Sequence, residues 1–191
     1  MIDNTTIGGI VLAAGTSSRF GEENKLLTEM DGVPMIRRAT KAMVQAGVRP
    51  IIVVVGYESD RVERAVGGLP VEVVENPQYQ RGQSTSVATG IRALDDQVSA
   101  VVIALGDMPF VAPSTIRSII EAYEANRGTV LAATFDGQRG NPVLFDRRHF
   151  DDLCSISGDV GGRHIIEREG VLIETDDRGV HRDVDSPNDL I

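Results

Sequence analysis

The sequence has a single cysteine, Cys154, no tryptophan and only two lysines, Lys25 and Lys41, among its 191 residues. One cysteine excludes an internal disulfide framework and a zinc site built from several cysteines. Aromatic side chains make up 4% of the residues, so the core has to be built mostly from Val, Ile, Leu and Ala. No apolar run approaches the roughly 20 residues of a membrane-spanning helix, and the first residues lack a cationic segment followed by an apolar one. The sequence therefore predicts a cytoplasmic protein that does not bind membranes.

Charge and hydropathy indicate an acidic globular domain. The formal net charge is −9 at pH 7, which disfavours nucleic-acid binding because that binding requires a basic surface that replaces phosphate counterions. Hydrophobic residues make up 41% of the chain and the mean hydropathy is −0.06, values typical of a soluble globular protein. A length of 191 residues corresponds to about one domain. We therefore expect a single domain over residues 1–191, in which an anionic ligand is held by a few local cations.

Short runs of β-branched residues alternate with helical patterns, which is typical of βαβ units on a parallel sheet. Strands are predicted at residues 7–13, 51–55, 71–74, 100–105 and 129–134, and helices at residues 34–46, 59–66, 84–94 and 112–126. Several strand runs are apolar throughout, as expected when helices cover both faces of a sheet. Asp136-Gly137 then predicts a hairpin turn, after which the chain adds an antiparallel strand to the sheet. The sequence thus predicts an α/β fold, a three-layer α/β/α Rossmann-like architecture with a mixed, mostly parallel sheet.

The segment after the first predicted strand, LAAGTSSRFGEENK, is the most informative stretch of the chain. Small side chains at its start let backbone amides approach a ligand closely. We expect the following four residues to bind a nucleotide: Leu12, Ala13, Ala14 and Gly15. Arg19 and Lys25 place two cations on the same loop, where they can bind a triphosphate and neutralise the charge that develops during phosphoryl or nucleotidyl transfer. The loop therefore predicts a polyphosphate site, with Arg19 and Lys25 as catalytic candidates.

This loop matches neither of two common nucleotide-binding motifs. It lacks the Gly-Lys-Ser/Thr ending of a Walker loop, and it lacks the G-x-G-x-x-G fingerprint of hydride-transfer Rossmann enzymes. Taken alone, it is also compatible with an ordinary surface loop, because small residues follow the first strand of many unrelated sheets. The three histidines, His149 among them, fit no catalytic pattern and are expected to be solvated or to cap helices.

A carboxylate follows the apolar run AVVIAL. Asp107 is therefore expected at the carboxyl edge of the sheet, where open α/β folds bind ligands. Mg²⁺, which keeps several waters and bridges phosphates, suits a site with one or two carboxylates. Asp107 is thus a catalytic and metal-binding candidate, and Asp185 is the natural second carboxylate. A structural role stays open for both, because Asp107 can form a turn and Asp185 can cap a short helix.

The order of short motifs resembles a known family. The pattern L-A-[AG]-G-x-S-x-R-x-G followed by Lys is similar to the N-terminal signature of nucleotidyltransferases, and it most resembles the MobA-like NTP transferases of the molybdenum-cofactor branch. Matching segments follow in order at residues 75–77 with 82 and 84–86, 106–109, 140–143, 158–163 and 183–187. The resemblance implies a nucleotidyltransferase (GT-A-like) fold. It also implies Mg²⁺-dependent transfer of a nucleoside monophosphate with release of pyrophosphate.

The resemblance also implies roles for individual residues. In such enzymes the positions of Asp107 and Asp185 are associated with Mg²⁺. Base and ribose contacts are implied for Asn76, Gly82 and Ser84. The Leu-Ala-Ala-Gly sequence is similar to the cytidylyl (MocA-like) branch, whereas Leu-Ala-Gly-Gly resembles the guanylyl branch. Ala14 therefore favours CTP over GTP.

The second half of the chain, roughly residues 134–191, is expected to bind the acceptor. Asn141 and Pro142 resemble a Gly-His-Pro-Val segment in which this chain has Asn instead of His; Asn is neither a cation nor a general acid near neutral pH, which leaves the acceptor open. The glycines around Asp159 and Gly161 suggest a helix start whose free amides suit the acceptor phosphate, or an ordinary capped surface helix. The implied acceptor is molybdopterin or its molybdenum-loaded form, with a molybdenum hydroxylase as recipient of the product.

Four alternatives remain at this point. Two keep the chemistry and change a substrate: guanylyl transfer to the same pterin, and cytidylyl transfer to a sugar or alditol phosphate. A third is a non-catalytic nucleotide-binding chaperone that delivers cofactor to a molybdenum hydroxylase. The fourth is an oxidoreductase, a class found among a few members of the family, which the missing dinucleotide fingerprint disfavours.

Overall fold

The computed structural model describes residues 5–16, 24–158 and 162–184. In these residues, seven strands form one sheet in the order β5-β4-β1-β6-β8-β7-β9. The strands are β1 (Thr6–Ala13), β4 (Ile51–Val55), β5 (Glu72–Glu75), β6 (Val98–Leu105), β7 (Val130–Phe135), β8 (Gln138–Asp146) and β9 (Gly170–Glu174). Strand β8 runs antiparallel to β6 and β7, and the other neighbouring pairs are parallel. The predicted α/β fold class with a mixed, mostly parallel sheet is confirmed.

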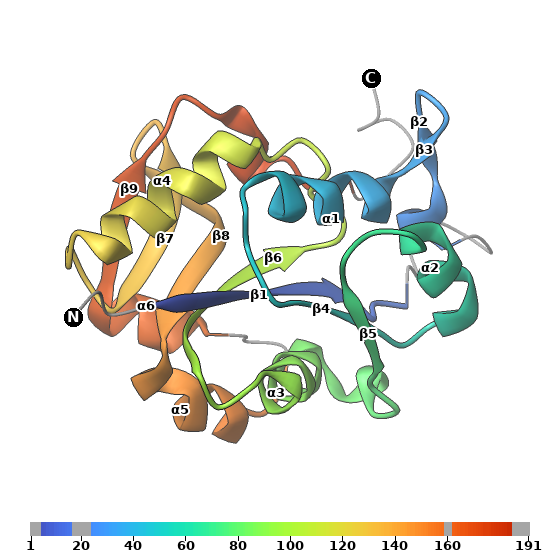
Figure 1. Ribbon diagram of the computed structural model, residues 1–191, viewed down its shortest axis with the longest axis horizontal. Coiled ribbons are helices and arrows are strands. Elements are labelled where there is room, and N and C mark those ends of the chain that lie inside the picture. The colour runs from blue at the N-terminus through green and yellow to red at the C-terminus, as the bar shows by residue number, and fades with distance from the viewer. Residues whose placement is uncertain (1–4, 17–23, 159–161, 185–191) are drawn as a thin grey trace.

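Helices cover both faces of the sheet (Figure 1). One face carries α1 (Met35–Gln45), α2 (Ser59–Val66) and α4 (Pro113–Glu124), and the other carries α3 (Gln83–Ala93), α5 (Phe150–Ser155) and α6 (Arg163–Glu169). Successive strand residues point to opposite faces, so each strand contributes to both apolar layers. In β1, Val11 packs with the layer under α1, α2 and α4, whereas Ile10 packs with the layer under α3, α5 and α6.

Local sequence signals explain where these elements begin and end. Pro113 occupies the first turn of α4, where its missing N–H costs no hydrogen bond, and Gly47 follows α1 with a positive φ of 87°. Asp136 and Gly137 both have positive φ, and Phe135 pairs directly with Gln138 across them. The predicted hairpin turn between β7 and β8 is thereby confirmed.

Short elements connect the larger ones. These are the 3₁₀ helices η1 (Lys25–Leu27), η2 (Tyr79–Arg81), η3 (Arg147–His149) and η4 (Arg178–His181), and the two-stranded hairpin of β2 (Glu29–Met30) and β3 (Val33–Pro34). In the described part of the chain, no helix is long and apolar enough to cross a membrane.

The order of the strands places a crevice beside β1. The chain runs from β1 outward to β4 and β5, and then returns to the opposite side of β1 with β6. The connections that leave the carboxyl ends of β1 and β6 therefore diverge, which is where open α/β sheets bind ligands.

A partly buried carboxylate lies at the end of β8 that is away from the cavity. Asp146 accepts hydrogen bonds from the Arg148 backbone N–H at 2.9 Å and from the Tyr123 hydroxyl at 2.7 Å. Burial disfavours the charged form, but these hydrogen bonds outweigh it and hold the pKa of Asp146 below its ordinary value. Burial, together with the Asp146 carboxylate, raises the pKa of the Tyr123 hydroxyl well above its ordinary value.

Candidate functional site

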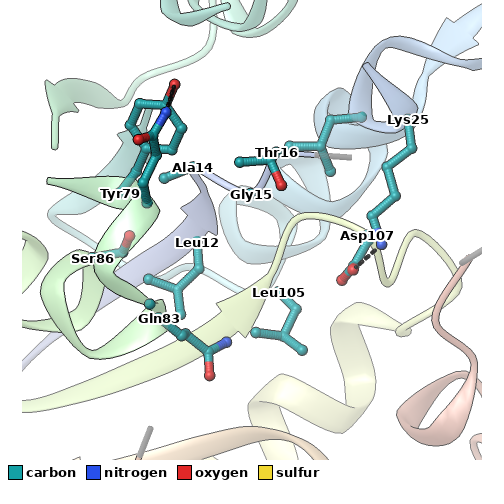
Figure 2. A pocket seen from close by; sticks show the side chains of 13 residues that line it. Leu12, Ala14, Gly15, Thr16, Lys25, Tyr79, Gln83, Ser86, Leu105 and Asp107 are labelled. Atoms are coloured by element: carbon teal, nitrogen blue, oxygen red, sulfur yellow. Dashed lines mark hydrogen bonds and ion pairs between the residues drawn. The ribbon is translucent and has the colours of Figure 1, made fainter. Parts of the chain in front are cut away.

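A cavity of about 460 Å³ opens at the carboxyl ends of β1 and β6 (Figure 2). In the described part of the chain, four separate segments line it. Leu12, Ala14, Gly15 and Thr16 belong to β1 and its loop, and Lys25 and Leu26 belong to η1. The segment from η2 into α3 contributes Tyr79, Gln80, Gly82, Gln83 and Ser86, and the end of β6 contributes Leu105 and Asp107.

The loop after β1 presents backbone atoms, rather than large side chains, to this cavity. Among the described residues, a Cβ on Gly15 would meet nothing within 4 Å, so this part of the backbone is open to a ligand. Ala14 packs against Gly56, where a Cβ would lie 2.9 Å from the Ala14 Cβ and 2.7 Å from the Tyr79 side chain. Of the predicted nucleotide-binding residues, Leu12, Ala14 and Gly15 line the cavity, whereas the Ala13 side chain points into the core.

Lys25 and Asp107, which lie 82 residues apart in the sequence, form an ion pair at the cavity. The Lys25 Nζ is 2.7 Å from the Asp107 Oδ2, and the two side chains are 16% and 22% exposed. Figure 2 shows the two side chains facing each other on one side of the cavity, with Tyr79 and Ser86 on the other. The structure therefore brings together a cation and a carboxylate that the sequence singled out separately.

Neighbouring residues hold this pair in place. Asn24, which is buried, caps η1 by accepting the Leu26 N–H at 3.1 Å and donates to the Tyr57 carbonyl at 3.2 Å. Gly106 donates its N–H to the Leu12 carbonyl at 2.9 Å. A Cβ at this glycine would lie 2.8 Å from Ile36 and 2.9 Å from the Leu12 carbonyl oxygen, so a side chain there would push β6 away from β1.

The predicted base-binding residues occupy three different environments. Gly82 lines the cavity with φ at 108°. Asn76 is 2% exposed and is not among the lining residues; its amide donates to the Thr85 Oγ1 at 2.8 Å and to the Ser86 Oγ at 3.0 Å. Ser84 is buried outside the cavity, and its N–H donates to the Gly158 carbonyl at 3.2 Å. Asn76 thus fixes the first turn of α3 rather than facing the cavity.

Among the described residues, the polar lining residues that were not predicted as site residues are Thr16, Tyr79, Gln80, Gln83 and Ser86. A signal for Ser86 was present, because residues 84–86 are among the segments that resemble the family. The approach of the Tyr79 ring depends on Gly56, and no local pattern indicates it.

The predicted acceptor and metal residues are only partly described by the structure. Asn141 and Pro142 border a small cavity of about 10 Å³ together with Leu105, which also lines the larger cavity. Arg19, Asp159, Gly161 and Asp185 lie outside the described residues. Val184 donates its N–H to the Asp107 carbonyl at 3.0 Å, so the described chain runs to this point of the site. Within the described residues, no cluster of three or more His, Cys, Asp or Glu side chains is suited to hold a metal ion.

Comparison with known families and curated proteins gives one family match and two informative relatives. Residues 9–173 match the MobA-like NTP transferase domain. Bifunctional protein GlmU of Geobacter metallireducens is 31% identical over 150 residues, which are 76% of this chain and 31% of that protein. The chain thus spans about a third of the length of this relative. Nicotine blue oxidoreductase of Paenarthrobacter nicotinovorans is 25% identical over 193 residues and is covered for 94% of its length, against 96% of this chain.

Among solved structures, Rv0371c from Mycobacterium tuberculosis superposes with a TM-score of 0.83 at 27% identity. The superposition covers 97% of this chain and 95% of that one. A second structure of Rv0371c, in complex with manganese, superposes with a TM-score of 0.78 over 97% and 96% of the two chains. The described architecture is therefore shared over nearly the full length of both chains.

Proposed function

The chain belongs to the MobA-like NTP transferase domain family, a family of nucleotidyltransferases, and on this premise we propose that it transfers CMP from CTP to the phosphate of a molybdopterin-type cofactor. The observation that supports the proposal most directly is the 2.7 Å contact between Lys25 and Asp107 at the cavity. A cation and a carboxylate side by side, beside open backbone amides, suit a triphosphate that binds with a divalent cation.

The two sides of the cavity differ in chemistry, and this difference orients the nucleotide. Lys25 and Asp107 form the charged side, which suits the phosphates. Tyr79 and Ser86 form the uncharged side, where an aromatic ring and a hydroxyl suit a base and its ribose. Asn76 donates to the Ser86 oxygen and so orients this hydroxyl, whose hydrogen and second lone pair suit a polar group of the ligand.

The reaction we propose needs no covalent intermediate. A phosphate oxygen of the acceptor attacks the α-phosphorus of CTP in line, and pyrophosphate leaves. A phosphate monoester is already anionic at neutral pH, so no general base is required and catalysis depends on positioning and on charge neutralisation. Lys25, with Arg19 from the same loop, would bind the phosphates.

A divalent cation fits the donor set at the cavity. Mg²⁺ in nucleotide sites is held by one or two carboxylates and takes its other ligands from water and phosphate oxygens. Asp107 supplies one carboxylate at the cavity, and Asp185 would supply the second. The manganese complex of the relative Rv0371c supports a divalent ion in this fold. Such an ion would neutralise the charge that develops on the phosphates.

The choice of CTP and of a pterin acceptor rests on fewer observations. The Ala14 methyl group lies at the cavity beside Gly56 and Tyr79, where it narrows the space beside the loop, and the expected discrimination between bases is only ~1–3 kcal/mol. Asn141 stands where the resemblance places a histidine, so sugar or alditol phosphates compete with the pterin as acceptors. One relative is an oxidoreductase, but this chain lacks the G-x-G-x-x-G fingerprint of hydride-transfer enzymes, which disfavours that activity here.

The proposal is tested by measuring pyrophosphate release with CTP, GTP, ATP and UTP, each combined with molybdopterin, its molybdenum-loaded form and a set of sugar and alditol phosphates. We expect the highest kcat/KM for CTP with a pterin. Equal turnover of GTP and CTP would contradict the cytidylyl assignment. Tight CTP binding without transfer to any acceptor would favour the nucleotide-binding chaperone instead.

Replacing Lys25 by Gln is expected to lower kcat/KM for CTP about 100-fold, because the substitution removes a charge-assisted contact to the phosphates. The matched control is Lys41→Gln on the exposed surface of α1, which removes the same charge away from the cavity and leaves the rate unchanged. Steady-state pyrophosphate release checks both variants. Equal loss in the two would show that overall charge, rather than Lys25, determines the rate.

A further inference from the structure

The segment 177–184 packs along the connection between β6 and α4. Its contacts follow the connection in reverse order: Asp177 meets Ala112 and Thr115, and Val184 meets Asp107. Asp107, whose carboxylate faces Lys25, lies near the start of this connection. The segment therefore contacts the back of the site without contributing to the lining of the cavity among the described residues.

Asp177 is the first anchor of this segment. Its Oδ2 accepts the Ala112 N–H at 2.8 Å and the Thr115 hydroxyl at 2.7 Å, and its Oδ1 accepts the Gly179 N–H at 2.8 Å. Ala112 is the N-cap of α4 and provides no side-chain cap of its own. Asp177 thus caps α4 from 65 residues away, where a negative charge at a helix N-terminus is favourable.

The rest of the segment continues the contact toward the cavity. A Cβ on Gly179 would lie 2.3 Å from the Phe110 carbonyl oxygen, so the two backbones touch directly. The Arg182 guanidinium carbon lies 3.8 Å from the centre of the Phe110 ring, within cation–π range. Val184 then donates to the Asp107 carbonyl at 3.0 Å. The backbone at Asp107 is therefore fixed both by β6 and by this segment.

We propose that Asp177 is a positioning residue for nucleotidyl transfer, which anchors the segment 177–184 on the β6–α4 connection and thereby holds the Asp107 carboxylate in place at the cavity. The inference rests on the proposed function, because it assigns to Asp107 the role given above. Asp177 acts through the position of the Asp107 backbone rather than through a contact to the nucleotide, so its loss slows the chemical step and leaves nucleotide affinity intact.

The test compares Asp177→Asn with Asp146→Asn. Asp177 accepts two backbone N–H groups and the Thr115 hydroxyl, and Asp146 accepts the backbone and side-chain N–H of Arg148 and the Tyr123 hydroxyl. Asp146 lies at the end of β8 away from the cavity, so it is a comparable carboxylate that does not contact the β6–α4 connection. We expect Asp177→Asn to lower kcat about 10-fold with KM for CTP within about twofold, since small misplacement of a catalytic group costs up to about 100-fold. Asp146→Asn is expected to leave kcat and KM within about twofold of wild type. Equal kcat values for the two variants would overturn the proposal.

A second readout does not depend on activity. Hydrogen exchange measured by mass spectrometry is expected to accelerate in peptides covering residues 107–115 and 177–184 of Asp177→Asn, with the rest of the sheet unchanged. Unchanged exchange in these peptides would overturn the anchoring role even if wild-type protein proves inactive with every nucleotide. Inactivity of wild type with normal anchoring would instead reject the proposed function.

Substitution of Thr115 tests the same anchor with a smaller structural perturbation, in case Asp177→Asn fails to fold. Thr115→Ser keeps the hydroxyl that donates to Asp177, and we expect wild-type kcat and exchange. Thr115→Val removes only that donor at similar volume, and we expect kcat to fall about threefold with faster exchange at residues 177–184. Identical behaviour of the two variants would contradict the proposal.

Discussion

Replacing Asp107 by Asn is expected to reduce kcat/KM for pyrophosphate release about 1,000-fold, the size of effect seen when a group that stabilises transition-state charge is removed. The amide has nearly the shape of the carboxylate but carries no charge, so it pairs poorly with Lys25 and binds a divalent cation weakly. Near-normal thermal stability is expected, because Asp107 lies partly exposed at the mouth of the cavity rather than in the core. Steady-state rates across a magnesium titration provide the measurement.

The control for this variant is Asp136→Asn. Asp136 lies in the exposed turn between β7 and β8 with φ at 54°, a conformation that asparagine also tolerates. We expect its activity to match wild type. If Asp107→Asn retained more than a tenth of the wild-type rate at saturating magnesium, the role assigned to Asp107 would be wrong.

Replacing Ile10 by Ala is expected to lower the free energy of unfolding by about 2–5 kcal/mol, the range for large-to-small substitution in a packed core. Ile10 is fully buried in β1 and fills the space that Gly90 of α3 leaves, where a Cβ would lie 2.8 Å from Ile10. The substitution therefore leaves a cavity between the sheet and α3. Urea unfolding followed by circular dichroism measures the loss.

Leu172→Ala serves as the comparison, because this side chain on β9 is 47% exposed. Its free energy of unfolding is expected to stay within about 0.5 kcal/mol of wild type. In a third variant, Ile10→Ala combined with Gly90→Ala, the new methyl group occupies part of the cavity and is expected to recover part of the loss. Equal losses for Ile10→Ala and Leu172→Ala would show that the layer under α3 is not tightly packed.

Elements with a continuous apolar run or a clear helical period were predictable, even where they are short. Residues 51–55 were predicted as a strand and form β4 with the same bounds, and residues 59–66 likewise form α2. Strand β9 was not assigned, since only one of its five residues is buried and the run gives no clear period. The glycines before Arg163 did suggest a helix start, and α6 begins at that residue. The direction of β8 followed from its hairpin turn, whereas its place between β6 and β7 depends on long-range pairing.

The site was predictable in outline for a similar reason. The carboxyl ends of β1 and β6 are marked by small or acidic residues directly after apolar runs, and neighbouring parallel strands bring those ends together. Asn76 shows the limit, because its hydrogen bonds to Thr85 and Ser86 depend on how η2 turns into α3. His149 was expected to be solvated or to cap a helix. It does occupy the N-cap position of α5, but its side chain makes no capping hydrogen bond. The ring is buried instead, with Nε2 3.0 Å from the Thr129 hydroxyl, a contact that no local pattern encodes.

Because lysine is scarce, chemical modification of lysine side chains can report whether a ligand occupies the cavity. Reagents that acylate primary amines meet only two side chains, Lys25 with 16% of its surface exposed beside Asp107, and Lys41 on the outer surface of α1. A molecule that fills the cavity shields the first amine and leaves the second as an internal reference. The ratio of the two modified peptides thus reports occupancy of the cavity without a radiolabel or a coupled assay.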